Sequence, residues 1–110
     1  MPADASSPST EHRLFASQAF VLLVEYTAPL ARIDELLEDH RAWLDAHFAD
    51  GTFLVSGPRV PRVGGTILAT GTSRGQLEDV VASDPLVRAG AARYDVVEFV
   101  PNRGPYASSA

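Results

Sequence analysis

Apolar residues fill the segment AFVLLVEY at residues 19–26, on both of the faces that alternate residues of a strand present. Short runs rich in β-branched and aromatic residues are typical of strands. A strand with two apolar faces is covered on both sides in a folded protein. The pattern therefore predicts a central strand here.

A different spacing follows at residues 30–49, where apolar residues recur every three or four positions. This is the period of a helix with one buried face. An aspartate-glycine pair directly after it is typical of a helix C-terminus. The buried stripe contains Leu37 and Leu44, and the position between them on that stripe is His40. The pattern predicts a long amphipathic helix with an imidazole on its inner face.

Five further elements are predicted before the C-terminal tail. They are strands at 52–57 and 65–71, a short helix at 73–83, one helical turn within 83–90 and a strand at 93–100. In the turn, Asp84 takes the cap position and Pro85 the first helical position, the usual order at a helix start. The element order is β-α-β-β-α-β, which predicts an α+β, ferredoxin-like fold.

One domain accounts for most of the 110 residues, and a hydrophobic content of 45% is enough for a packed core. Residues 1–17, rich in Ser, Pro and Ala, are predicted to be a disordered tail. Residues 102–110 are predicted to be a second tail. The domain is therefore expected to span residues 18–101.

The predicted arrangement leaves part of the sheet uncovered. In a ferredoxin-like unit the helices cover one face, whereas the first and last strands here are apolar on both faces. A second copy of the chain is the simplest cover for the other face. We therefore expect a homodimer in which two sheets pack together as a dimeric α/β barrel.

Composition excludes several classes of function. The chain has no cysteine, which excludes disulfides, thiolate metal sites and a cysteine nucleophile and fits a cytoplasmic location. All nine basic residues are arginine, so no lysine can form a Schiff base. The net charge of −5 argues against nucleic-acid partners. The longest apolar run is too short to span a membrane, and the polar N-terminus does not resemble a signal peptide.

His40 is the first candidate for chemistry, because histidine is the side chain best suited to proton transfer near neutral pH. A core histidine that hydrogen-bonds a carbonyl group is the alternative interpretation. A catalytic role needs a partner, and Asp84 is the candidate, because its turn precedes the last strand, which lies beside the first in this topology. Asp84 can equally be only a helix cap.

Three more residues are candidates for substrate binding. Ser56 ends a predicted strand and lacks the sequence found around a nucleophilic serine, so we expect it to hydrogen-bond a substrate. Arg59 in the following loop, with a second arginine three residues on, is placed to attract an anion, although loop arginines are more often simply solvated. Trp43, close to one helical turn after His40, either walls a pocket or packs in the core.

No metal or cofactor is expected. His47 lies too far from His40 along the helix for both to bind one metal ion. The glycines between residues 64 and 75 have neither the spacing of a phosphate-binding loop nor that of a dinucleotide-binding fingerprint. The expected chemistry therefore rests on side chains alone.

In their order and spacing, several short motifs resemble the YCII-related family of small dimeric α/β-barrel proteins. Members show a histidine followed four residues later by leucine, then a glycine and a strand that ends in Ser/Ala-Gly-Pro, then an Asp-Pro pair, a glycine and an aromatic strand. The matching residues here are His40, Leu44, Gly51, Ser56-Gly57-Pro58, Asp84-Pro85, Gly90 and 94–99. The resemblance covers nearly all of residues 19–101. Trp43, where tyrosine is commoner, and Leu86, where an aromatic residue often follows Asp-Pro, depart from the pattern.

The resemblance implies an acid-base dyad of His40 and Asp84 in a cleft of each subunit. One lineage of the family looks like a dehydrochlorinase for chlorinated hydroxyquinols, and wider relatives with this barrel include muconolactone isomerases and cofactor-free monooxygenases. We therefore expect a cofactor-independent lyase or isomerase acting on a small cyclic or aromatic metabolite, with His40 as general acid or base. A non-catalytic module that binds a small molecule in the same cleft is the alternative.

Overall fold

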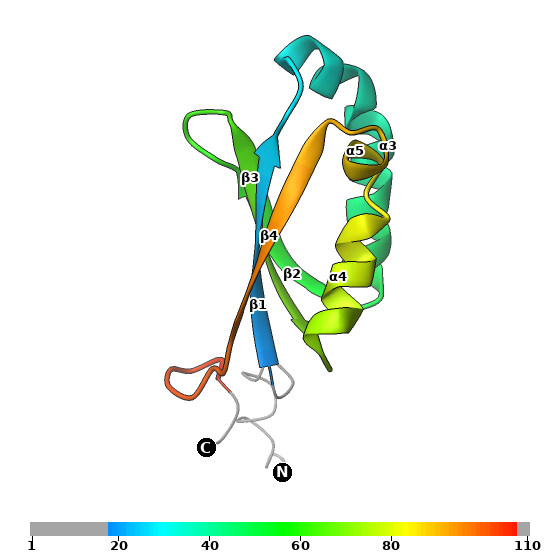
Figure 1. The fold of residues 1–110 in the computed structure, drawn as a ribbon. Helices are drawn as coiled ribbons and strands as arrows, with labels where there is room; N and C mark the ends of the chain where they lie inside the picture. The colour runs from blue at the N-terminus through cyan, green and yellow to red at the C-terminus, as the bar shows by residue number, and fades with distance from the viewer. Residues whose placement is uncertain (1–17, 108–110) are drawn as a thin grey trace.

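Figure 1 shows the fold in a computed structural model, which describes residues 18–107. Over this range, four strands form one sheet and three helices lie on one side of it. In chain order the elements are β1 (Gln18–Tyr26), α3 (Leu30–Ala49), β2 (Phe53–Pro58), β3 (Gly64–Gly71), α4 (Arg74–Ala82), α5 (Pro85–Arg88) and β4 (Ala92–Phe99). The predicted N-terminal tail and the last three residues of the predicted C-terminal tail lie outside the described residues.

The strand order is β2-β3-β1-β4, and every pairing is antiparallel. This is the ferredoxin-like α+β fold that the element order predicted. Each predicted strand and each predicted helix, apart from the single turn, lies within one residue of its observed bounds. Because β4 pairs with β1 as an edge strand, the turn that precedes β4 lies beside β1, and its helix α5 packs against α3.

The core lies between the sheet and the helices. Alternate residues of β1 face the helices and are buried, namely Phe20, Leu22 and Val24. The helix side chains that complete the core are Ile33, Trp43, Leu77, Val81 and Leu86. Along α3 only Ile33 and Trp43 are buried, so other residues on its inner face are available to line a cavity. Within the described part of the chain, no helix is both long enough and apolar enough to cross a membrane.

The opposite face of the sheet carries apolar side chains that none of the three described helices covers (Figure 1). Val97 and Phe99 of β4 are 43% and 40% exposed, and Val55 of β2 is 57% exposed. On β1, Val21 and Leu23 are half-buried on the same face. We call this surface, formed by Val21, Leu23, Val55, Leu68, Val97 and Phe99, the open sheet face.

Candidate functional site

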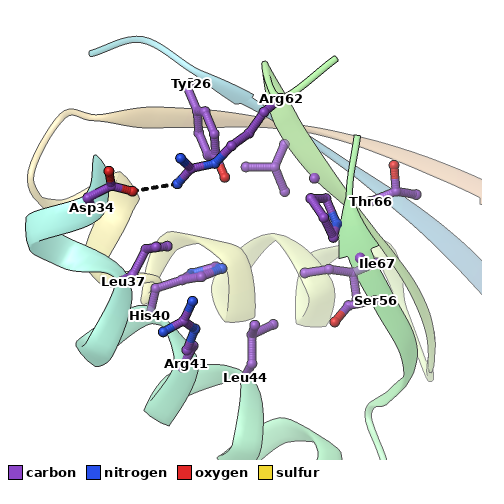
Figure 2. Close-up of a pocket in the computed structure, with 14 residues that line it drawn as sticks. Tyr26, Asp34, Leu37, His40, Arg41, Leu44, Ser56, Arg62, Thr66 and Ile67 are labelled. Atoms are coloured by element: carbon purple, nitrogen blue, oxygen red, sulfur yellow. Dashed lines mark hydrogen bonds and ion pairs between the residues drawn. The ribbon is translucent and has the colours of Figure 1, made fainter. Parts of the chain in front are cut away.

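A pocket of about 570 Å³ lies between α3 and the sheet, on the side of β2 and β3. Ligand pockets commonly have volumes of about 300–1,000 Å³. The lining residues, shown in Figure 2, are Val24, Tyr26, Asp34, Leu37, His40, Arg41, Leu44, Ser56, Gly57, Pro58, Arg62, Gly65, Thr66 and Ile67. The pocket therefore has room for a small cyclic compound and presents apolar walls together with a few polar groups.

His40 projects toward this pocket from the middle of α3 (Figure 2). It shares a helix face with Leu37 and Leu44, which lie about one turn away on either side and also line the pocket. Its side chain is only 14% exposed. The inner face of α3 thus has a titratable side chain at a position where an apolar core residue is usual, and this side chain reaches the pocket.

Behind His40, away from the pocket lining, lies the carboxylate of Asp84. Nδ1 of His40 is 2.9 Å from Oδ1 of Asp84, which is completely buried. The N–H of Leu86 donates to Oδ1 at 2.9 Å, and the hydroxyl of Tyr94 donates to Oδ2 at 2.5 Å. An ionised carboxylate accepts all three hydrogen bonds. With an ionised Asp84, Nδ1–H of His40 would donate to Oδ1, and Nε2 would be the basic nitrogen left for the pocket.

Asp84 contacts His40 and also caps a helix, so it makes both of the contacts considered for it in the sequence. It is the N-cap of α5, with Pro85 in the first turn, and the oxygen that accepts from the Leu86 amide is also the oxygen that contacts His40. Gly90, with a φ of 71°, ends the segment in a left-handed conformation that favours glycine and leads into β4. The cap and the contact with His40 therefore depend on the same local turn.

Tyr94 also belongs to this cluster; it lies in the aromatic strand of the family resemblance, but no role at the site was predicted for it. Strand alternation places it on the inner face of β4, but its contact with Asp84 depends on how the preceding turn packs. Burial is the main cause that raises the pKa of Tyr94 well above its ordinary value, and the neighbouring Asp84 carboxylate raises it further. The hydroxyl therefore remains protonated and keeps its donor role.

Trp43 packs in the core and is not among the residues that line the pocket. Its ring stacks on that of His40, with centroids 5.7 Å apart and an interplanar angle of 26°. Its indole N–H donates a 2.9 Å hydrogen bond to Oγ of Ser83. Trp43 therefore packs in the core against His40, and the role in substrate binding that the sequence left open for it stays a prediction.

Ser56 lies in the pocket wall, at the place where a hydrogen bond to a substrate was expected. Arg59 is exposed and does not line the pocket, so its role in attracting an anion stays a prediction. Arg62, three residues on, lines the pocket instead, and its Nη2 lies 2.6 Å from Oδ1 of Asp34. The other lining residues with polar side chains that no sequence motif marked are Tyr26, Arg41 and Thr66.

The second histidine of α3 takes no part in the pocket. His47 contacts Asp50, with Nδ1 and Oδ2 3.1 Å apart. A hydrogen bond from the Thr52 side chain is the largest cause that lowers the pKa of Asp50. Within residues 18–107, no group of three or more histidine, cysteine or acidic side chains is arranged to hold a metal ion.

Comparison with known proteins gives a family and a fold. The profile of the YCII-related domain matches residues 19–100. No curated protein matches the sequence. Among solved structures, the chain is similar to 5-chloro-2-hydroxyhydroquinone dehydrochlorinase (TftG) from Burkholderia phenoliruptrix AC1100 in complex with 2,5-dihydroxybenzoquinone. The TM-score is 0.61 and the identity 19%, and the match covers 82% of this chain and 99% of that one. At this identity the similarity shows a shared fold.

Proposed function

Because the chain belongs to the YCII-related domain family, we propose that it is a cofactor-independent enzyme of the lyase or isomerase type acting on a small cyclic or aromatic metabolite. The observation that carries the proposal is the 2.9 Å contact between His40 and Asp84, with the imidazole at the pocket and the carboxylate buried behind it. A dehydrochlorinase with the same fold, TftG, supports this choice of reaction and substrate class.

In the proposed reaction, Nε2 of His40 removes a proton from the substrate. Asp84 keeps the proton on Nδ1 and stabilises the imidazolium that forms, and Trp43 holds the ring in place. In a lyase the electron pair that is released expels a leaving group. In an isomerase it forms a new double bond, and His40 returns the proton to another atom. Proton transfer by a positioned side chain typically contributes about 10²–10⁴ in rate.

The proposal assigns a binding role to Ser56. Its hydroxyl lies in the pocket wall on β2, whereas His40 belongs to α3. A hydroxyl both donates and accepts hydrogen bonds, which suits a substrate oxygen whose charge changes during proton transfer. Neither this role nor that of His40 requires a cofactor, because proton transfer needs only an acid-base group and a hydrogen-bond partner.

We further propose that a second copy of the chain covers the open sheet face. Apolar side chains occupy most of it, while Glu25 and Arg93 at one end, and Asp95 beside Val97 on β4, carry charges of both signs. A surface of this kind can be self-complementary across a two-fold axis, because each charge can face its opposite on the partner. The dimeric barrel and the cytoplasmic location expected from the sequence both stay predictions.

The function is tested by following the protons of candidate substrates in heavy water. Hydroxyquinols, including 5-chloro-2-hydroxyhydroquinone, and lactones are incubated with wild type, His40→Gln and His47→Gln. The last variant is a matched control, because His47 lies on the same helix but outside the pocket lining. We expect deuterium incorporation or loss of the leaving group with wild type and the control, and a rate at least about 100-fold lower in His40→Gln.

Turnover that survives His40→Gln at the wild-type rate would contradict the proposed mechanism. Compounds that bind with an affinity dependent on His40, but that are never converted, would instead identify a non-catalytic module. Such a module would use the same pocket to hold a small molecule.

A further inference from the structure

An ion pair joins the loop between β2 and β3 to α3 across the pocket. Arg62 belongs to the loop and Asp34 to the helix, and both residues line the pocket. Nη2 of Arg62 lies 2.6 Å from Oδ1 of Asp34. Figure 2 shows the arginine side chain extending from the loop toward the helix, with Tyr26 beside it. The pair therefore belongs to the pocket and not to the remote surface.

Asp34 contacts only one nitrogen of the Arg62 guanidinium. The contact joins one guanidinium nitrogen to one carboxylate oxygen, whereas a guanidinium can bind a carboxylate through two parallel hydrogen bonds. The two side chains are 39% and 56% exposed. Ion pairs that are this exposed contribute little to stability. A second carboxylate that enters the pocket can therefore replace Asp34 at small cost.

The charges of the pocket differ from those of the chain. The whole protein carries a net charge of −5, yet the charged lining residues are two arginines, Arg41 and Arg62, and one aspartate, Asp34. The charged lining residues therefore carry a net charge of one positive unit, which favours a small anion over a cation. When Asp34 leaves Arg62, that guanidinium presents its donors to the pocket, on the same side of the sheet as His40.

We propose that Arg62 is the anion-binding group of this pocket and that its ligand is a small cyclic or aromatic carboxylic acid, whose carboxylate takes the place of Asp34. The pair itself shows the chemistry, because the group that Arg62 contacts is a carboxylate. The ring of the acid then lies against Leu37, Leu44 and Ile67 and extends toward His40. The binding of such an acid does not depend on the proposed function. Only the claim that the acid is also the substrate rests on it.

The test uses benzoate and its neutral analogue benzamide, with binding measured by calorimetry. The variants are Arg62→Gln and Asp34→Asn. The chain offers matched controls, Arg32→Gln and Glu35→Gln, because Arg32 and Glu35 form an exposed 3.0 Å pair on the same helix outside the pocket lining. Each control makes the same change of charge as the corresponding variant, at a place that a pocket ligand does not touch.

Wild type is expected to bind benzoate more tightly than benzamide. Arg62→Gln should weaken benzoate at least about tenfold, because a charged hydrogen-bond partner is lost, and should leave benzamide unchanged. Asp34→Asn should tighten benzoate by about two- to fivefold, because the internal competitor is removed. Tighter binding cannot arise from a folding defect, so this variant keeps the test decisive if Arg62→Gln is unstable.

Equal affinity of wild type for benzoate and benzamide would overturn the proposal. The same holds if Asp34→Asn behaves like Glu35→Gln, or if Arg62→Gln behaves like Arg32→Gln. The outcome for the reaction is separate, because benzoate binding involves no proton transfer. If these variants behave as expected but no candidate substrate is converted, the ligand class stands and the proposed reaction fails.

Discussion

Tyr94 donates a 2.5 Å hydrogen bond to Oδ2 of Asp84, the oxygen opposite the one that contacts His40. A carboxylate held at both oxygens cannot rotate freely, so the direction in which Oδ1 faces the imidazole is set by a residue outside the pocket lining. Tyr94 is therefore a positioning residue for the His40–Asp84 pair. Its contribution is measurable without knowledge of the substrate.

The variant Tyr94→Phe isolates this hydrogen bond. It keeps the ring and leaves Oδ2 of a fully buried carboxylate without its donor. Leaving a buried acceptor unsatisfied typically costs about 1–3 kcal/mol, so the free energy of unfolding in urea should fall by about that amount. A fall below about 0.3 kcal/mol would show that water or another donor replaces the hydroxyl.

Tyr94 also predicts a loss of stability in alkali. Burial raises its pKa in the folded protein above the value of about 10 that it has when unfolded. Above about pH 10 the Tyr94 hydroxyl loses its proton in the unfolded state but keeps it in the folded state. The free energy of unfolding should therefore fall as the pH rises, by about 1.4 kcal/mol per pH unit. Urea unfolding of wild type and Tyr94→Phe through this range should show the slope reduced in the variant. Equal slopes would argue against the predicted shift.

Substitutions of Asp84 separate its charge from its role as a helix cap. Asparagine is as good a helix cap as aspartate, so Asp84→Asn keeps the bond to the Leu86 amide. The oxygen that makes this bond also faces Nδ1 of His40 and can still accept a hydrogen bond, so the nitrogen NMR shifts of His40 should show the same tautomer as in wild type. Because the negative charge that would stabilise an imidazolium is lost, turnover should fall at least about 100-fold. Asp84→Ala loses the cap as well and should unfold more easily by a further ~1 kcal/mol. Turnover of Asp84→Asn at the wild-type rate would contradict the proposed role of the Asp84 charge.

Gly64 is the glycine whose replacement should damage the sheet most. A Cβ there would lie 1.7 Å from the backbone oxygen of Val24 on β1, so the two strands would have to separate. Gly64→Ala should lower the free energy of unfolding by more than about 2 kcal/mol. Gly57→Ala is the control, because nothing lies within 4 Å of its added carbon, and it should change stability by less than about 0.5 kcal/mol.

The open sheet face gives a prediction about assembly. Val97→Asp places a charge on that face, on a side chain of the edge strand β4 that is 43% exposed. Because the described residues leave this position accessible, the monomer should stay folded while the dimer dissociates. Sedimentation should give a dimer for wild type and a monomer for the variant. A monomeric wild type would remove the proposal that a second copy covers this face.

The elements were predictable because their signals are local. The bounds of α3 follow from a repeat of three to four residues between a proline and an aspartate-glycine pair, and β1 from its apolar run. The inner position of His40 follows from the same repeat. The predicted pairing of β4 with β1 also indicated that Asp84 lies near α3. It could not predict that the Asp84 and His40 side chains lie within hydrogen-bond distance of each other.

The details of the site depend on contacts between distant segments. Arg59 and Arg62 are equivalent in the sequence, yet only Arg62 lines the pocket, because the loop that carries both bends back before β3. Trp43 lies near His40 on α3, but its indole is taken up by the core and by Ser83. No sequence pattern shows which of two neighbouring residues lines the pocket, because the position of each side chain depends on how a second element packs against it.

One oxygen of Asp84 serves two neighbours, the imidazole of His40 and the backbone amide of Leu86. When the α5 turn opens by local unfolding, both bonds break together, and the amide proton of Leu86 becomes free to exchange with water. The protection of this single amide therefore sets an upper limit on how often Asp84 and His40 are in contact. It can be measured by hydrogen exchange before any substrate is known.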